Sequence, residues 1–168
     1  MLFKTERLYL RRFTKADAGL IYELNQDPEV TRYTGDPIHD LEQAASVLQN
    51  NILPQYTLYN MGRWAVHETE GGAFTGWCGL KYRPEREEID LGYRFMKKYW
   101  GKGYAFESAR ACINYGFSVL NLGVITGRAM PENIASWKVL EKCGMQFSKN
   151  ETVDGHPAKT YIIQNPYK

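Results

Sequence analysis

One stretch decides the fold of this chain: Lys98-Tyr99-Trp100-Gly101-Lys102-Gly103-Tyr104-Ala105. It follows residues 89–96, whose alternating apolar side chains are typical of a strand, and it precedes residues 102–120, whose apolar spacing is typical of a helix. The two glycines allow a tight bend and a close approach of a ligand to the main chain. The first N–H groups of a helix have no acceptor in that helix and lie at the positive end of its dipole. The junction is therefore predicted to bind a phosphate or pyrophosphate, with Lys98 and Lys102 adding positive charge.

Two common phosphate-binding motifs do not fit this stretch. The dinucleotide fingerprint G-x-G-x-x-G fails because Phe106 stands where the third glycine is required. No part of the chain has the pattern G-x-x-x-x-G-K-[ST]. Both absences argue against a nucleotide-binding α/β domain of another family. The pattern that remains is [Q/R]-x-x-G-x-[G/A] with Lys98 at its first position, and a plain glycine-rich turn is the alternative interpretation.

Length and composition indicate one globular domain, expected to extend over residues 1–168. The net charge of +2 is too small to argue for a nucleic-acid or membrane partner. No apolar run is long enough to span a bilayer, and the first residues lack the apolar core of a signal peptide, so a cytoplasmic location is expected. Three widely spaced cysteines fit no zinc or redox pattern and are expected to be reduced and buried. No group of potential ligands has metal-binding spacing, so no metal is predicted.

The first half of the chain predicts strands around two helices. A strand is expected over residues 7–13, followed by a helix that Thr14 caps together with Asp17. A second helix is expected to begin at Asp40 and to end at Pro54. Further strands are predicted at residues 63–68, 73–81 and 89–96, the first two joined by a glycine turn at 71–72.

The second half predicts two helices and three strands. The helix after the glycine stretch carries small residues on one stripe, which favours close packing against a sheet: Ala105, Ala109, Cys112 and Gly116. A strand at 123–130 precedes a helix that begins at Asn133 as N-cap and ends before Gly144. Residues 145–153 and 159–164 are expected to form a closing pair of strands. The resulting order, β-α-α-β-β-β-α-β-α-β-β, predicts mixed α/β layers around one core.

In this order, the chain resembles the GNAT N-acetyltransferase superfamily over nearly its whole length. Four segments carry the resemblance, and they are most similar to the branch that includes the ribosomal-protein alanine N-acetyltransferases. They are the opening strand Thr5 to Arg11, the loop Asp27 to Tyr33, the cofactor segment Leu91 to Ala105, and the N-x-x-S helix with its turn, Asn133 to Met145. The resemblance implies an α/β (α+β) domain with a mixed, mostly antiparallel twisted sheet, helices on both faces, and a splayed central strand pair.

The resemblance also implies an activity, the transfer of acetyl from acetyl-coenzyme A to a primary amine by direct attack in a ternary complex. The backbone after the strand would bind the pyrophosphate, and the main chain of Phe95 and Met96 would pair with the pantetheine arm as an added strand. Ordinary strand core is the alternative role of these two residues. The implied cofactor site comprises Phe95, Met96, Lys98, Trp100, Gly101, Lys102, Gly103, Tyr104, Ala105, Asn133 and Ser136.

The resemblance assigns Ser136 to protonate the departing thiolate. Many relatives use a tyrosine seven residues after the asparagine, where this chain has Leu140. A simple place in the first helical turn is the alternative role of Ser136. Asp90 and Glu88, on one face of the strand before the glycines, are candidates for the proton relay from the amine. A solvated acidic edge is the alternative interpretation of these carboxylates.

Four aromatic residues are expected to line the acceptor site or, alternatively, the core: Tyr33, Trp64, Trp77 and Tyr93. The acceptor is open between a protein N-terminus, an amino acid or polyamine, and an aminoglycoside-like drug. A monomer or a homodimer is expected. The rival interpretation is a module of the same fold that binds acetyl-coenzyme A as a sensor or interaction protein without catalysis.

Overall fold

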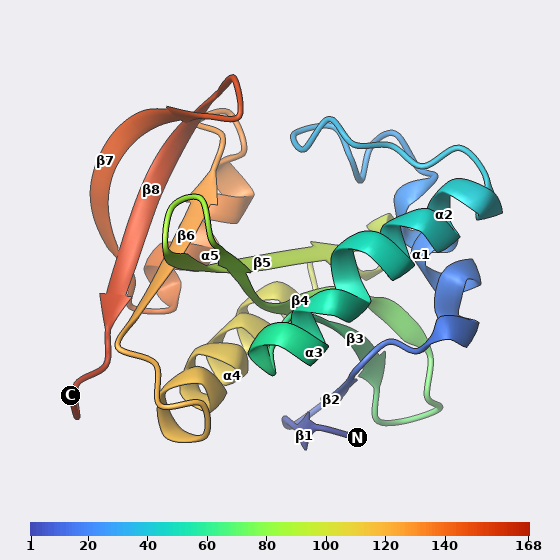
Figure 1. The fold of residues 1–168 in the computed structure, drawn as a ribbon, viewed down its shortest axis with the longest axis horizontal. Coiled ribbons are helices and arrows are strands. Elements are labelled where there is room, and N and C mark those ends of the chain that lie inside the picture. The colour runs from blue at the N-terminus through green and yellow to red at the C-terminus, as the bar shows by residue number, and fades with distance from the viewer.

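The computed structural model describes residues 1–168, which form one twisted eight-stranded sheet (Figure 1). The strand order is β1-β2-β3-β4-β5-β6-β8-β7, and only β5 and β6 run parallel. This confirms the predicted mixed, mostly antiparallel sheet. The strands are β1 Phe3–Lys4, β2 Leu8–Arg11, β3 Arg63–Glu68, β4 Phe74–Arg83, β5 Glu88–Phe95, β6 Val124–Ala129, β7 Gln146–Val153 and β8 His156–Gln164.

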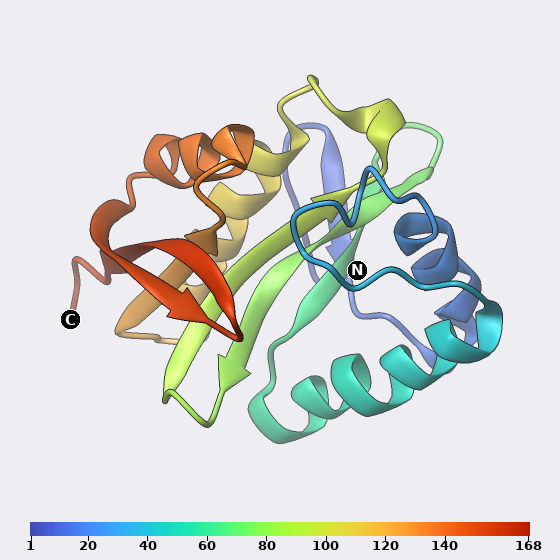
Figure 2. The same ribbon diagram turned by 90° about the horizontal axis from the view of Figure 1, so that it is seen from above.

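Helices cover both faces of the sheet, as the resemblance implied (Figure 2). The helices α1 to α3 lie on one side, and α4 and α5 lie on the other. The helical segments are η1 Lys15–Asp17, α1 Ala18–Asn25, α2 Leu41–Val47, η2 Leu48–Ile52, α3 Leu53–Tyr59, η3 Lys97–Tyr99, α4 Tyr104–Ser118 and α5 Ile134–Lys142.

The second predicted helix does not end at Pro54, so that prediction was wrong. A π-helical turn, η2, follows α2, and the chain continues into α3 with Pro54 in its first turn. A proline is tolerated there because its missing N–H would have no helical acceptor in any case. The helix ends at Asn60, whose left-handed φ of 57° breaks the helical geometry.

The predicted helix starts had mixed outcomes. Thr14 and Asp17 form the expected capping box, and Asp40 caps α2 by accepting a hydrogen bond from the N–H of Gln43 at 2.7 Å. Asn133 is the N-cap of α5, but its side chain makes no capping hydrogen bond, contrary to the prediction. The Asn133 amide is therefore available to a ligand. The short strand β1 was not predicted.

The small-residue stripe of α4 packs directly on the sheet, as predicted. A Cβ added at Gly116 would lie 2.9 Å from Leu80 and 3.1 Å from Ile125. All three cysteines are free and buried, and burial raises the pKa of the Cys143 thiol to about 12. No helix is both long enough and apolar enough to cross a membrane.

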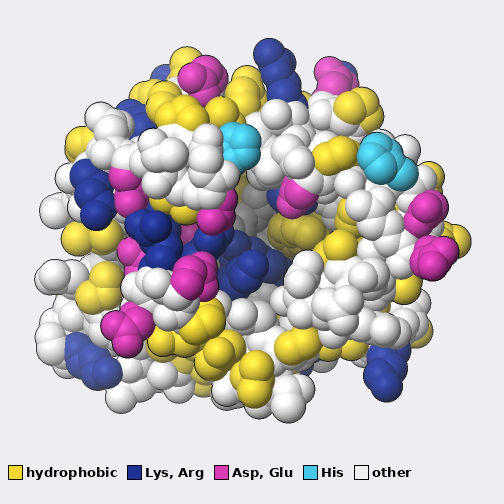
Figure 3. Space-filling view, turned by 45° about the horizontal axis from the view of Figure 1, so that its top comes forward, with side chains coloured by type: hydrophobic (Ala, Val, Ile, Leu, Met, Phe, Trp, Pro, Cys, Tyr) yellow, Lys and Arg dark blue, Asp and Glu magenta, His cyan; other side chains and the backbone are white.

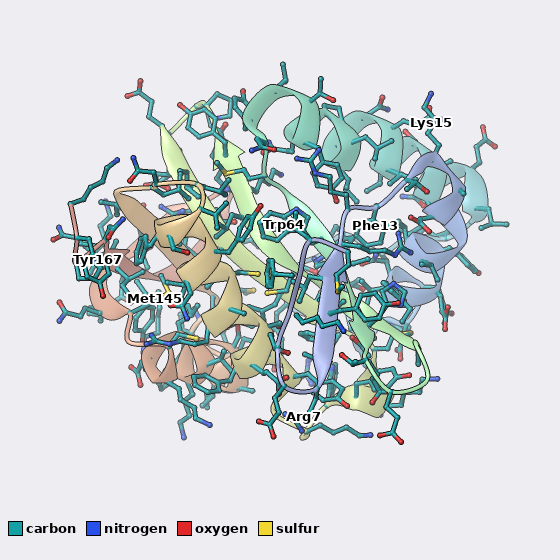
Figure 4. The ribbon with its side chains drawn as sticks, turned by 90° about the horizontal axis from the view of Figure 1, so that it is seen from below. Arg7, Phe13, Lys15, Trp64, Met145 and Tyr167 are labelled. Carbon is teal, nitrogen blue, oxygen red and sulfur yellow. The ribbon has the colours of Figure 1, made fainter.

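Trp64 belongs to this core and does not line a binding site, which corrects the prediction for this residue. Its side chain is 1% exposed and packs edge-on against the rings of Phe3 and Tyr115 (Figure 4). Trp64 and Val66 lie on the same face of β3, and helix α4 covers this face through Tyr115, which contacts Trp64. Because side chains alternate between the two faces of a strand, the side chain of Trp64 points into the core.

Candidate functional site

The sheet opens between its two parallel strands. β5 and β6 pair only at Asp90 with Thr126 and at Leu91 with Gly127. Beyond these residues β5 stays paired with β4 as far as Phe95, while β6 stays paired with β8 as far as Ala129. A gap therefore separates residues 92–95 from the end of β6, and the predicted splayed strand pair is confirmed.

The main chain of β5 presents polar groups to this gap. The N–H of Met96 donates to the carbonyl of Thr75 at 2.9 Å, so Met96 pairs with β4. Since successive residues of an antiparallel ladder face opposite neighbours, the N–H and carbonyl of Phe95 face the gap. The Phe95 carbonyl accepts a hydrogen bond from the indole Nε1 of Trp100 at 2.8 Å. The ring of Phe95 is buried in the core, whereas its backbone N–H and carbonyl face the gap.

A run of free amides lies just after the gap, at the start of α4. The first helical bond of α4 runs from the N–H of Glu107 to the carbonyl of Gly103 at 3.0 Å. The N–H groups of residues 101–106 donate no hydrogen bond within the protein. Gly101 and Gly103 have left-handed φ angles of 78° and 83°, which let these amides turn outward together. Such a helix start fits a pyrophosphate.

Cationic side chains surround these amides. The ammonium groups of Lys98 and Lys102 lie 5.3 and 5.7 Å from the centre of the Tyr99 ring. Arg7, near the N-terminus, also lies beside these amides: its Nη2 would be 3.4 Å from a Cβ atom added at Gly103. Its Nε is paired with Glu107 at 2.7 Å (Figure 4).

Arg7 was not predicted as part of this site. In the sequence Arg7 is the first residue of a predicted strand, and no local pattern connects it with Gly103, almost a hundred positions later. The contact arises because Glu107, in the first turn of α4, accepts hydrogen bonds from the Arg7 N–H and from the Thr5 hydroxyl. These bonds hold the segment before β2 beside the helix start.

Two hydroxyl groups meet across the gap. The phenol of Tyr93, on β5, donates to the carbonyl of Ser136, on α5, at 2.7 Å. The Ser136 hydroxyl in turn lies 3.3 Å from the Tyr93 oxygen and donates to it. Burial raises the pKa of Tyr93 above its ordinary value, with the Ser136 hydrogen bond opposing this effect. Tyr93 is therefore protonated at neutral pH, and Asn133 lies one helical turn before this pair.

The two candidate carboxylates both have arginine partners. Asp90 is buried, with Oδ2 2.8 Å from Nη2 of Arg63 and 3.8 Å from Nε of Arg83. Glu88 lies 2.7 Å from Nη2 of Arg128. Of the two, only Asp90 lines the cleft described next. Both carboxylates are therefore already engaged in ion pairs within the protein.

A cleft of about 510 Å³ opens on the sheet face opposite α4 (Figure 3). Its walls come from the loop before α2, from η2, from the end of β6, and from the turn between β7 and β8. Tyr33, Trp77 and Tyr93 line it, and so do Asn133 and Ser136. The structure therefore gathers three of the four predicted acceptor residues beside the hydroxyl pair. Dark blue Lys and Arg side chains fill the bottom of this hollow.

The fold and site define a class of protein that binds a phosphate-bearing donor along a split sheet and a second molecule in a facing cleft. A family model described as the acetyltransferase (GNAT) domain matches residues 7–146. The chain belongs to this family of acetyltransferases, whose acetyl donor is acetyl-coenzyme A. It is an enzyme of the N-acetyltransferase type.

Individual relatives support the assignment. The chain is 34% identical over 145 residues to the uncharacterised N-acetyltransferase p20 of Bacillus licheniformis, a match that covers 84% of this chain and 80% of p20. The crystal structure of an acetyltransferase from Agrobacterium tumefaciens superposes with a TM-score of 0.83 at 26% identity, covering 96% and 93% of the two chains. The spermidine N-acetyltransferase of Vibrio cholerae, solved with CoA and spermine, shares the fold at a TM-score of 0.77 and 19% identity, covering 94% and 95%.

Proposed function

We propose that this enzyme transfers the acetyl group of acetyl-coenzyme A directly to a primary amine while both substrates are bound. The observation that carries the proposal is the gap between β5 and β6. It lies between the free amides of residues 101–106 and the residues of the cleft, so a donor bound along it would present its thioester to an acceptor in the cleft. In this proposal residues 1–168 act as one catalytic domain, since β8 pairs with β6 beside the gap.

The donor would be held mainly by backbone groups. When bound, acetyl-coenzyme A supplies the acetyl group as an activated thioester. The amides of residues 101–106 would bind its diphosphate, with Lys98, Lys102 and Arg7 adding positive charge. The backbone of Phe95 at the end of β5 would hold the pantetheine arm, with the Phe95 N–H directed at the thioester carbonyl. The expected pairing of Met96 with the arm is not part of this proposal, because its N–H and carbonyl are already bonded to Thr75 and Tyr99. The free amide of Asn133 supports a further contact.

Ser136 is the proposed proton donor to the departing thiolate. Its hydroxyl carries one proton, which can rotate from Tyr93 toward the gap. Tyr93 then acts as a positioning residue, because its own hydrogen bond fixes the Ser136 backbone. Many relatives use a tyrosine on the helix that corresponds to α5 as the proton donor, but this chain has Leu140 at that position. The hydroxyl pair of Ser136 and Tyr93 would take over this role. No cysteine lines the cleft, which supports direct attack over an acyl-cysteine route.

Proton removal from the amine is proposed to pass through water beside Asp90. A free α-amine has a pKa of about 7.7–8.0, so a substantial fraction is already neutral near pH 7.5 and needs no strong base. Asp90 is preferred over Glu88 because only Asp90 lines the cleft. The α-amine of a peptide, which the resemblance to the ribosomal-protein alanine acetyltransferases favours, and the amine of a small molecule are the two proposed acceptor types.

The deciding experiment measures release of coenzyme A thiol from acetyl-coenzyme A with a panel of peptides and small amines. Calorimetry of coenzyme A binding runs in parallel. Acetylation of any amine supports the proposal. Tight binding of coenzyme A with no thiol release across the panel would instead identify a non-catalytic acetyl-coenzyme A module.

A further inference from the structure

The floor of the cleft is cationic. Four basic side chains of the strands β3 to β5 line it, namely Arg63, Lys81, Arg83 and Arg94, and Asp90 is the one buried carboxylate among the cleft residues. Arg128 of β6 also lines the cleft, but its guanidinium is paired with Glu88 and Glu151. Their placement on one face follows from cross-strand pairing, in which Trp77, Lys81 and Arg83 of β4 stand opposite Arg94, Asp90 and Glu88 of β5. Three of these cations are well covered, with Arg94, Arg63 and Arg83 side chains only 10%, 16% and 22% exposed.

Glycines on β4 and β5 leave space for the guanidinium of Arg63 on this face of the sheet. Arg63 starts on β3 and reaches across β4 to Asp90 on β5, where its guanidinium donates to the carbonyls of Gly79 and Asp90. A Cβ at Gly92 would lie 2.4 Å from Nη2 of Arg63, so any larger residue there would displace the guanidinium from its present position. Gly79 is the cross-strand partner of Gly92. Two adjacent glycines thus provide the path along which Arg63 lies in the cleft.

The floor is not neutralised by the acids nearby. Asp90 shares its charge between Arg63 and Arg83, and the Arg83 Nε has no hydrogen-bond acceptor. The other acidic partners of these four cations are Asp36, Glu85 and Asp154, whose side chains are 57%, 60% and 77% exposed, so water and salt screen them. Lys81 has no ion pair: burial, then repulsion by Arg63 and Arg83, lowers its pKa.

We infer that the acceptor is a small amine that also carries a carboxylate, and that Lys81 and Arg83 bind this carboxylate on the cleft floor. This inference rests on the proposed acetyl transfer and names the substrate class for it. An arginine fork and a lysine ammonium suit a carboxylate, whose negative charge would offset the repulsion around Lys81. The aromatic wall of Trp77, whose ring already packs under Arg94 at 4.9 Å, leaves room for the alkyl part of such a molecule.

The same floor opposes polycationic acceptors. A second ammonium group placed near Lys81 and Arg83 would meet like charge, which disfavours its binding in a partly buried site. The fold shared with a spermidine N-acetyltransferase is therefore no argument for a polyamine acceptor in this cleft.

The test compares amines of similar length that differ in their second group: 4-aminobutanoate, butylamine and 1,4-diaminobutane, with 3-aminopropyl phosphate as a further arm. The rate of thiol release gives kcat/KM for each. We expect 4-aminobutanoate to exceed 1,4-diaminobutane by about tenfold or more. An equal or higher value for the diamine would overturn the inference, and a higher value for the phosphate would overturn the carboxylate as the recognised group.

Variants test the assigned residue. Lys81→Met is expected to reduce the ratio of 4-aminobutanoate to diamine toward one, and Lys81→Glu to invert it. Lys15→Met removes an exposed lysine remote from the cleft and should leave the ratio unchanged (Figure 4). A ratio that survives Lys81→Glu would overturn the role of Lys81.

The outcome for acetyl transfer is separable. Coenzyme A binding without acetylation of any of these amines would overturn the carboxylate inference and leave the donor site standing. Failure to bind coenzyme A would overturn the proposed function itself.

Discussion

The phenol of Tyr93 donates a 2.7 Å hydrogen bond to the backbone carbonyl of Ser136, and this bond joins β5 to α5 across the opening in the sheet. The acceptor is a backbone group, so the bond orients the first turn of α5 whatever the state of the Ser136 hydroxyl. It leaves that hydroxyl 3.3 Å from the Tyr93 oxygen, to which the hydroxyl donates a hydrogen bond. The proposed proton donor therefore has a support that neither residue reveals alone.

Ser136→Ala is expected to lower kcat by about 100-fold, because general-acid assistance to a leaving group contributes this much or more. The affinity for coenzyme A should change little, since the backbone of α5 stays in place. Tyr93→Phe should lower kcat less, and the double variant should lose little beyond Ser136→Ala. Steady-state thiol release measures these effects. Ser118→Ala removes an exposed helical hydroxyl and serves as control. An unchanged kcat for Ser136→Ala would exclude it as the acid.

Gly103→Asp is expected to weaken coenzyme A binding by about 10- to 100-fold, because it sets a negative charge beside the diphosphate. The substitution also strains a residue at φ 83°. Gly71→Asp is the matched control, since Gly71 has φ 84° in an open turn between β3 and β4. Calorimetry should therefore separate the charge effect from the strain. Equal affinity of the two variants would contradict the site at residues 101–106.

Gly116→Ala is expected to destabilise the protein by about 1–3 kcal/mol, because the new methyl group overpacks the contact between α4 and the sheet. The nearest atoms, on Leu80 and Ile125, would lie at 2.9 and 3.1 Å. Gly19→Ala, at an exposed position of helix α1 with nothing within 4 Å, should instead stabilise by about 0.4–1 kcal/mol. Urea denaturation of both variants measures the difference. Stabilisation by Gly116→Ala would show that α4 does not press on the sheet.

Glu151 should make stability depend on acid pH. The Thr160 hydroxyl, and then the Arg128 guanidinium, lower the pKa of Glu151 to about 2 against the opposing effect of burial. A carboxylate with a depressed folded pKa stabilises fully above its unfolded pKa of about 4.3, and this stabilisation is lost as the pH falls toward 2. Wild type should exceed Glu151→Gln in free energy of unfolding at pH 7, and the difference should shrink below about pH 4.

The measurement is urea denaturation at several pH values between 7 and 2.5. Glu70→Gln, an exposed acid in the turn between β3 and β4, is the control and should follow wild type. A difference between wild type and Glu151→Gln that grows on acidification would contradict the pairing of Glu151.

Much of the fold was predictable because local chemistry specified it. The Thr14 and Asp17 cap, the glycine turn at 71–72 and the strand β5 are specified by neighbouring residues, and each appears as predicted. The burial of β5 does not alternate, because Asp90 is buried beside Leu91. The end of the second helix was not predictable in this way. A proline within a helical pattern usually marks the end of the helix, but here a π-helical turn precedes Pro54 and places it in the first turn of α3. Trp64 was misplaced for a related reason: alternation shows that a residue points to one face, but not whether that face is core or cleft.

The sequence by itself indicated the class of this protein, since four segments in the right order, the glycine stretch among them, resemble those of a GNAT acetyltransferase. Only the tertiary structure decided what surrounds the reacting groups. Arg7 beside Gly103, Tyr93 against Ser136, and four cations around Asp90 are contacts between residues far apart in the chain. Sheet pairing and helix packing bring such residues together, and side-chain charge acts through distance in space rather than along the chain.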